Sequence, residues 1–138
     1  MEHQHGFNGF QLEKAYGSTI KARNGSKCLK AKFERAKGVE GFKYIHTVIP
    51  CLTGWRFNPA KSVEVVRLGV QTWVWPLYEI EGGVLKLTLK PKRRPIEDYL
   101  KAQNRFRHLT DDQILYMQSE VDTKRQRLLE SDGKRVIL

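Results

Sequence analysis

The segment from Tyr44 to Trp55 constrains the fold more than any other part of the chain, because an apolar run ends abruptly and one thiol follows it. Residues 43–49 are rich in β-branched and aromatic side chains, which favour a buried strand. Pro50 ends this strand, and Cys51 comes directly after it. In open α/β sheets, ligands bind beside the carboxyl ends of the strands. The sequence therefore predicts that Cys51 lies at the functional edge of a sheet.

The residues before this strand predict a helix that starts near Cys28. Leu29, Phe33 and Ala36 recur at helical spacing on one face, and Gly38 is suited to the end of the helix. A helix, a short loop and a strand in this order form the second half of a βαβ unit. The pattern indicates an α/β fold.

The residues after the Cys51 loop predict a helix and a hairpin. Asn58 and Pro59 are typical of a helix start, and the helix is expected to reach about Thr72. Residues 78–81 and 84–89 then alternate apolar and polar side chains on either side of two glycines. Such a glycine pair predicts a two-residue β-hairpin turn.

The last 49 residues predict a basic linker and a helical tail. Residues 90–95 are basic and bounded by prolines, which favours an extended arm that lies along another subunit. A short helix is expected from Ile96 to about Gln103. Thr110 and Gln113 form a capping box for a helix that runs from Asp111 to about Ser131. Its loose apolar stripe (Ile114, Met117, Val121 and Leu128) suits docking on a partner.

Three segments result from these patterns. Residues 1–27 show no clear period and are expected to be irregular. Residues 28–89 are expected to form a partial α/β domain with a hairpin, and residues 90–138 a basic linker with a helical C-terminal tail.

Composition narrows the class of protein. The chain has 138 residues, suited to one small domain, and contains no apolar run of about 18 residues that could cross a membrane. Its first residues do not have the pattern of a signal peptide, so a cytoplasmic location is expected. Cys28 and Cys51 are the two cysteines, and two separated thiols cannot complete a metal site without further ligands.

The formal net charge of +10 has three interpretations. It suits nucleic-acid binding, with aromatic residues near Trp73 and Trp75 as stacking platforms. It also suits a face that docks on an acidic partner, or a fragment whose acidic complement lies elsewhere. The alternation of the two tryptophans is more simply explained by packing against a neighbouring layer, which disfavours nucleic acid.

Several separate motifs, in order, resemble one family over roughly Leu29 to Leu129. The chain resembles the C-terminal part of the thiamine-diphosphate-binding beta subunit of pyruvate:ferredoxin oxidoreductase (pyruvate synthase), and it is too short to be the whole subunit. The motifs are Tyr44 to His46 leading to Pro50 to Arg56, Trp75 to Ile80, Lys90 to Pro95, Ile96 to Leu100, and Asn104 to Thr110.

The resemblance implies a chemistry and a set of partners. The family decarboxylates pyruvate oxidatively, forms acetyl-CoA and passes electrons to ferredoxin, in a complex of alpha, beta, gamma and delta subunits. Its cofactors are thiamine diphosphate with magnesium and 4Fe-4S iron–sulfur clusters. The resemblance implies that Cys51 is one cluster ligand, and that Pro50, Gly54 and Trp55 shape the loop around it. The family's other cysteine ligands and diphosphate-binding residues are missing, so this chain alone is expected to bind no cofactor.

Simpler interpretations stand beside these. Taken alone, Cys51 is a buried free cysteine that packs as a small apolar side chain. His46 is a structural histidine of a strand, and His108 a surface residue before a helix. Two other functions remain open: a small basic nucleic-acid-binding module, and a non-catalytic remnant that docks on the other subunits.

Overall fold

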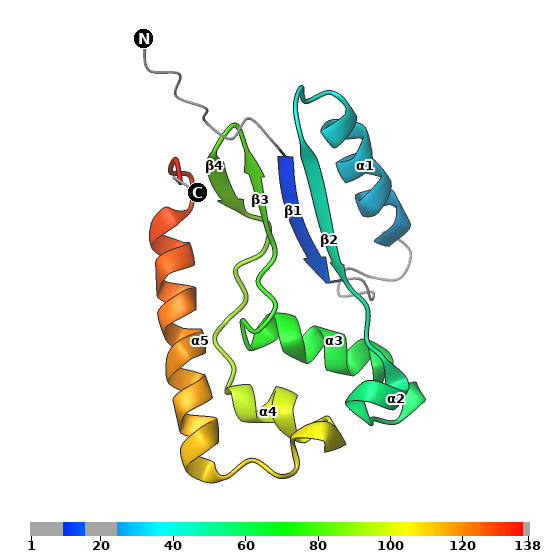
Figure 1. The fold of residues 1–138 in the computed structure, drawn as a ribbon, viewed down its shortest axis with the longest axis vertical. Coiled ribbons are helices and arrows are strands. Elements are labelled where there is room, and N and C mark those ends of the chain that lie inside the picture. Colours follow the sequence, from blue (N-terminus) through cyan, green and yellow to red (C-terminus); the bar gives the residue numbers. More distant parts are fainter. Residues whose placement is uncertain (1–9, 16–24, 137–138) are drawn as a thin grey trace.

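The computed structural model describes residues 10–15 and 25–136, which fold as a mixed α/β unit (Figure 1). The described strands form one sheet in the order β2-β1-β3-β4. The strands β1 and β2 are parallel, whereas β1 with β3 and β3 with β4 are antiparallel. The predicted α/β class is confirmed.

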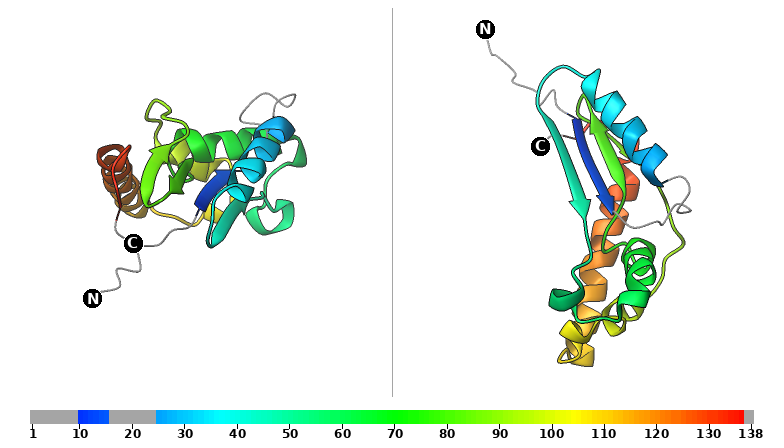
Figure 2. Two further views of the ribbon diagram at one scale, coloured as in Figure 1. Left: turned by 90° about the horizontal axis from the view of Figure 1, so that it is seen from above. Right: turned by 90° about the vertical axis from the view of Figure 1, so that its right-hand side faces the viewer.

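The first three elements form a complete βαβ unit. Strand β1 (Phe10–Ala15) and strand β2 (Lys43–Val48) are joined through helix α1 (Gly25–Lys37), which lies over one face of the sheet (Figure 2). The two strands pair in register over their full length, from Phe10 opposite Lys43 to Ala15 opposite Val48. The expected helix–loop–strand order is correct, and the strand that completes the unit lies where no element was expected.

Strand β1 corrects the expectation that residues 1–27 are irregular. Phe10 to Glu13 alternate apolar and polar side chains, but four residues are too few to predict a strand by themselves. The fold places this segment between β2 and β3, so it is paired on both sides. Pairing of this kind overrides weak local preference. Helix α1 also begins at Gly25, before the expected boundary at residue 28. Residues 1–9 and 16–24 lie outside the described residues.

The hairpin is confirmed with its turn. Strands β3 (Tyr78–Glu81) and β4 (Val84–Leu87) pair directly across Gly82 and Gly83. Both glycines have positive φ values, 56° and 80°, which a two-residue turn of this type requires. Strand β4 ends at Leu87 rather than Leu89. The next residue bonds back to the start of the hairpin, since the Thr88 N–H donates to the Leu77 carbonyl at 2.8 Å.

The predicted start of the central helix is also confirmed. The Asn58 side chain accepts a hydrogen bond from the Ala60 N–H at 2.9 Å, and a 3-10 turn, η1 (Pro59–Lys61), leads into helix α3 (Ser62–Gln71). The helix ends before Trp73, whose φ of 64° is left-handed. A Cβ atom on Gly69 would lie 2.5 Å from Cδ1 of Trp75, so a glycine is needed where this ring crosses the helix.

The C-terminal helices pack on the rest of the chain. Helix α4 (Ile96–Lys101) and the 3-10 turn η2 (Asn104–Phe106) lead to helix α5 (Asp111–Ser131), which runs beside the hairpin (Figure 1). The predicted capping box is present: the Gln113 N–H donates to Thr110 Oγ1 at 3.4 Å, and the Thr110 N–H donates to Gln113 Oε1 at 3.0 Å.

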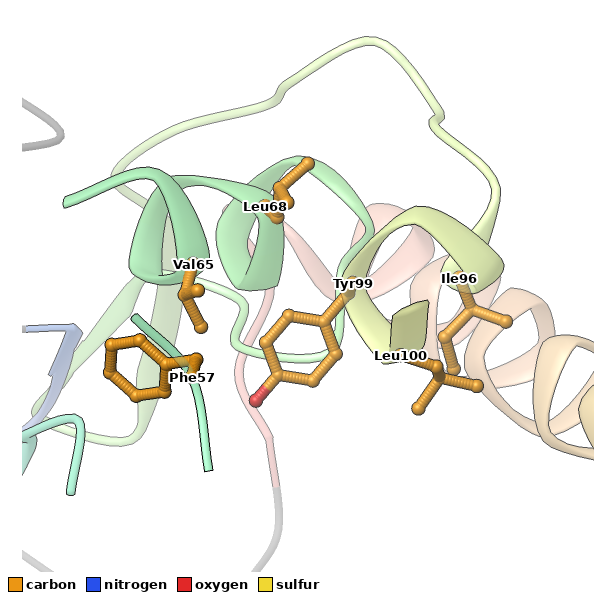
Figure 3. Close-up of a cluster of buried hydrophobic side chains, with 6 residues drawn as sticks. All are labelled: Phe57, Val65, Leu68, Ile96, Tyr99 and Leu100. Atoms are coloured by element: carbon orange, nitrogen blue, oxygen red, sulfur yellow. The ribbon is translucent and has the colours of Figure 1, made fainter. Parts of the chain in front are cut away.

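Helix α5 covers two hydrophobic clusters of its own chain. The first is built by residues of α3, α4 and the segment before them (Figure 3): Phe57, Val65, Leu68, Ile96, Tyr99 and Leu100. Ile114, Met117 and Val121 of α5 pack against it. Leu128 packs against the second cluster, formed by Trp73, Ile80, Leu85 and Leu87. The stripe that was expected to dock on a partner therefore contacts the chain's own core.

The basic linker is also bound to its own chain, which corrects the expectation of an extended arm. Arg93 donates two hydrogen bonds to Asp122, at 2.8 and 2.7 Å, and the pairing lowers the pKa of that carboxyl and raises the pKa of Arg93. The Trp73 indole N–H donates to the Pro91 carbonyl at 3.2 Å, and Lys90 pairs with Asp132. Such long-range pairs leave no periodic signal in a sequence.

Helix α1 is held on the sheet by charge pairs. Lys32 and Glu79 are both buried and form an ion pair, and Arg35 adds a contact to the second Glu79 oxygen at 3.0 Å. Among the described side chains of α1, Ala36 is the buried apolar residue, and it packs on Ile45. The ion pairs with Glu79 therefore act together with the apolar contact of Ala36 to hold α1 on the sheet.

We expect Glu79→Gln to lower the free energy of unfolding by about 3 kcal/mol, because the Lys32 ammonium then remains buried without its counter-charge. Urea denaturation of the two proteins measures the difference. Glu34→Gln is the matched control: its partner Lys37 is 3.3 Å away in an exposed pair, and the change is expected to stay within about 0.5 kcal/mol. Equal effects of the two substitutions would show that α1 is held by other contacts.

Candidate functional site at the Cys51 loop

Cys51 begins a single helical turn directly after β2. Ile49 and Pro50 leave the strand, and Cys51 adopts an extended conformation as the N-cap of helix α2 (Leu52–Trp55). The Trp55 N–H donates to the Cys51 carbonyl at 2.9 Å, and the left-handed Arg56, with φ of 54°, ends the turn. This turn was expected to be an irregular loop, because four residues are too few to show a helical period.

The sulfur of Cys51 caps this turn. The Gly54 N–H donates to Sγ at 3.3 Å, and the Thr53 hydroxyl oxygen lies 3.8 Å from it. A Cβ atom on Gly54 would lie 3.2 Å from Sγ, which is shorter than an ordinary van der Waals contact. Glycine at this position therefore lets the backbone approach the sulfur. The resemblance implied that Gly54 shapes this loop, and the atom that its backbone approaches is Sγ of Cys51.

The Cys51 thiol is exposed, and its surroundings favour the ionised form. The hydrogen bond from the Gly54 N–H, together with the Thr53 hydroxyl, lowers the pKa of Cys51 below its ordinary value. A thiolate is the form that binds soft metals and attacks electrophiles. The simpler interpretation of Cys51 as a buried apolar side chain is therefore wrong, because the side chain is exposed at the end of the strand.

Trp55 anchors the loop to the rest of the chain. Its half-buried ring packs on the first hydrophobic cluster, 6.3 Å from the ring of Phe57. The guanidinium of Arg105 stacks on it, with Cζ 4.3 Å from the Trp55 centroid and 4.4 Å from that of Phe106. Arg105 also donates to the Tyr99 hydroxyl at 3.4 Å, which in turn accepts from the Trp75 indole at 3.0 Å.

A backbone bond adds to this anchor, since the Asn104 N–H donates to the Arg56 carbonyl at 3.0 Å. The turn that carries Cys51 is thus fixed by η2, about fifty residues later in the chain. Arg105 lies within the Asn104 to Thr110 motif, but the sequence did not predict this role. The signal that could have found it is the neighbouring Phe106, which together with Trp55 offers two faces to one guanidinium.

The other residues that could bind a metal, namely Cys28, His46 and His108, do not form a metal site with Cys51 among the described side chains. Among the described residues, no three histidine, cysteine or acidic side chains gather as a metal site. Cys28 lies in α1, and its side chain is outside the described part. His46 lies in the middle of β2 with its ring 6.1 Å from that of Tyr44, and His108 is exposed. In the described part of the chain, Cys51 therefore offers one thiolate and no complete metal centre.

No helix within the described residues has both the length and the apolar composition of a membrane span.

Comparison with known proteins shows relatives in one group of oxidoreductases, although no family profile matches the chain. The pyruvate synthase subunit PorB of Methanothermobacter thermautotrophicus is 51% identical over 98 residues, covering 70% of this chain and 34% of the relative. The PorB subunit of Methanocaldococcus jannaschii is 48% identical over 94 residues, covering 67% of this chain and 32% of the relative. The ketoisovalerate oxidoreductase subunit VorB of Pyrococcus furiosus is 40% identical over 100 residues, with coverage of 70% and 32%.

Most of the chain is thus homologous to part of a subunit of a 2-oxo acid oxidoreductase. The relatives are PorB subunits of pyruvate synthase and VorB subunits of ketoisovalerate oxidoreductase. The predicted resemblance to this family is confirmed. The chain spans about a third of the length of these relatives. A match that covers 70% of the chain includes its middle wherever it begins, and so includes the Cys51 loop.

We expect the alkylation rate of Cys51 by iodoacetamide to rise with pH around a midpoint below that of an ordinary cysteine, because the Gly54 N–H and the Thr53 hydroxyl favour the thiolate and lower the pKa. In a Cys28→Ser background, Thr53→Val should move the midpoint to higher pH, since one of the two stabilising contacts is lost. Thr123→Val, which removes a hydroxyl far away on α5, should leave it unchanged. An unshifted midpoint for Thr53→Val would contradict the assigned cause.

We expect Arg105→Ala to speed hydrogen exchange of the Trp55 amide about fivefold, because a stacked guanidinium contributes about 1 kcal/mol and the turn then opens more often. Exchange followed by NMR measures the change. Arg107→Ala removes an exposed guanidinium from the next turn of the same segment and should leave the Trp55 amide unaffected. Equal rates in all three proteins would mean that the stacking does not hold the loop.

Proposed function

We propose that this chain supplies the cluster-loop region of a 2-oxo acid:ferredoxin oxidoreductase beta subunit, as its C-terminal part. In the complete enzyme the reaction is the oxidative decarboxylation of pyruvate to acetyl-CoA, with electron transfer to ferredoxin. The observation that carries the proposal is the Cys51 turn. It lies in the part of the chain that is similar to PorB, at the carboxyl end of a parallel strand, with an exposed thiol of lowered pKa.

The residues of the turn fit one corner of a 4Fe-4S cluster. Such clusters are held by four thiolates, and N–H groups directed at sulfur tune their potential. Cys51 is proposed as one of these thiolates, with the Gly54 N–H at its sulfur. Pro50 follows the end of β2, and Trp55 anchors the turn on the first hydrophobic cluster, so both residues are proposed to shape the loop that holds the cluster. When bound, the cluster supplies one-electron transfer; the three other thiolates come from outside the described residues.

Thiamine diphosphate with magnesium is proposed to bind in the part of the subunit that this chain does not contain. Magnesium takes oxygen ligands, mostly carboxylates and phosphates, and the described acidic residues do not gather into such a set. The described acids instead hold the fold, as Glu79, Asp122 and Asp132 show. The role proposed for the described chain is in electron transfer, through the Cys51 turn.

The proposed partners are the alpha, gamma and delta subunits of such a complex, with ferredoxin, pyruvate and coenzyme A as its reactants. A net charge of +10 suits an acidic electron carrier, because complementary charge speeds association. Pyruvate is proposed over other 2-oxo acids because the identity to PorB subunits reaches 51%, against 40% to VorB.

The nucleic-acid alternative is weakened by the structure. Trp73 is only 2% exposed, and the half-buried Trp75 packs against Gly69 and the first hydrophobic cluster, so neither ring is open for stacking with a base. Arg93 and Arg94, at the centre of the basic run, are each paired with an aspartate of this chain. The other alternative is a non-catalytic remnant that docks on the remaining subunits. It has the same partners as the main proposal, but it would bind no iron.

The test is a chimera in which the matching segment of Methanothermobacter thermautotrophicus PorB is replaced by that of this chain, purified without oxygen. We expect the iron count of the native subunit and an electron paramagnetic resonance signal of a reduced cluster. In Cys51→Ala the iron count and the signal should both fall, while Thr123→Val should keep them. A folded chimera, checked by circular dichroism, with unchanged iron in Cys51→Ala would contradict the proposed ligand.

A further inference from the structure

A shallow hollow lies where the basic linker passes the end of helix α3. It is lined by one residue of α3 and four residues of the linker: Gln71, Pro91, Lys92, Arg93 and Arg94. We call these residues the linker hollow. Its volume is about 440 Å³, which is within the range of about 300–1,000 Å³ that is typical of small-molecule sites. None of its residues takes part in the Cys51 turn.

The two arginines of the linker hollow are held in place by carboxylates of the same chain. Nε and Nη2 of Arg93 donate to Asp122 at 2.8 and 2.7 Å. Nε of Arg94 donates to Asp98 at 2.6 Å, and Nη1 of the same side chain donates to Gln71 Oε1 at 3.0 Å. A guanidinium that is fixed in this way loses little conformational entropy when it binds a further group.

The polar side chains of the linker hollow keep donors unused. Nη1 of Arg93, Nη2 of Arg94 and Nε2 of Gln71 have no acceptor among the described residues. Lys92 forms no ion pair with any residue in the described part of the chain. Arg67 lies one helical turn before Gln71 on α3 and adds a second exposed cation. The hollow therefore combines unused N–H groups with a surplus of positive charge.

These donors match a phosphate group better than a carboxylate. A carboxylate has two oxygens in one plane, whereas a phosphate ester carries a charge of about −1.5 to −2 and three oxygens that accept strong hydrogen bonds. Donors from four separate side chains can therefore share one phosphate group. Arginine and lysine are common phosphate-binding residues in proteins.

We propose that the linker hollow binds the phosphate group of a small molecule, which is either inorganic phosphate or a phosphorylated metabolite. The inference goes beyond the proposed role in electron transfer and does not depend on bound iron. The volume of the hollow exceeds that of a single phosphate ion, which favours the phosphorylated metabolite. The organic part of that molecule would occupy the rest of the hollow.

Nucleic acid is a poorer occupant, although it also carries phosphate. Its binding depends on a row of phosphate contacts and, for single strands, on bases that stack on exposed rings. The linker hollow offers one group of donors. Trp73, which follows Gln71 closely in the chain, is only 2% exposed and offers no ring for stacking.

The experiment titrates the 138-residue chain with inorganic phosphate and with ADP at constant ionic strength, and adenosine is the control without phosphate. We expect saturable one-to-one binding of phosphate and of ADP by calorimetry, and shifts of the Lys92, Arg93 and Arg94 amides in NMR spectra. Lys92→Gln should weaken this binding about tenfold, because a charge-assisted contact is lost. Lys30→Gln is the matched control: it removes the same charge from an exposed position on α1 and should leave the affinity unchanged.

A second variant separates specific contacts from net charge. Gln71→Leu removes a neutral donor together with the acceptor that orients Arg94, and the net charge of the chain stays the same. We expect it to weaken phosphate binding severalfold, while circular dichroism shows an unchanged fold.

The two affinities identify the source of the phosphate. Tighter binding of ADP than of inorganic phosphate, without binding of adenosine, would support a phosphorylated metabolite, and equal affinities would support inorganic phosphate. Absence of saturable binding, equal effects of Lys92→Gln and Lys30→Gln, or acetate binding as tight as that of phosphate would overturn the proposal. A mixed-sequence oligonucleotide that binds more tightly than ADP and shifts the same amides would also overturn it, because the occupant would then be nucleic acid.

Discussion

Strand β1 is the link on which the described sheet depends. Its six residues pair with β2 on one side and β3 on the other, so the βαβ unit and the hairpin meet through one short backbone segment. The ion pairs from α1 to Glu79 and Glu81 bridge the same two parts from above the sheet. Without β1, strand β2 would have no paired neighbour among the described strands, and Cys51 would lose the element that positions it.

The second half of the chain supports the same turn from the opposite side. Helices α3 and α4 build the first hydrophobic cluster, and Trp55 of the turn packs against it together with residues of α5. Arg105 then joins Trp55 to η2. The Cys51 turn therefore lies between the sheet and the helical part. Strand β2 holds its beginning, and the contacts of Trp55 with the first hydrophobic cluster and Arg105 hold its end.

The sequence predicted best those elements whose signals are local. The hairpin follows from Gly82 and Gly83, and the long helix from the capping box of Thr110 and Gln113, and both are present. Strand β1 was missed because its stability comes from two neighbours rather than from its own pattern. The position of Cys51 at the end of β2 could be predicted, but not its contacts. The pairing of Arg93 with Asp122, and the stacking of Arg105 on Trp55, join residues far apart in sequence.

The N-cap at Cys51 has a consequence for the energetics of ligand binding. The sulfur is oriented by the Gly54 N–H, a contact within the chain itself, and the indole of Trp55 fixes the far end of the turn. The loss of conformational entropy that a flexible loop would suffer on capturing a ligand has therefore already occurred during folding. A thiolate held in this way binds a ligand with little reorganisation of the surrounding turn.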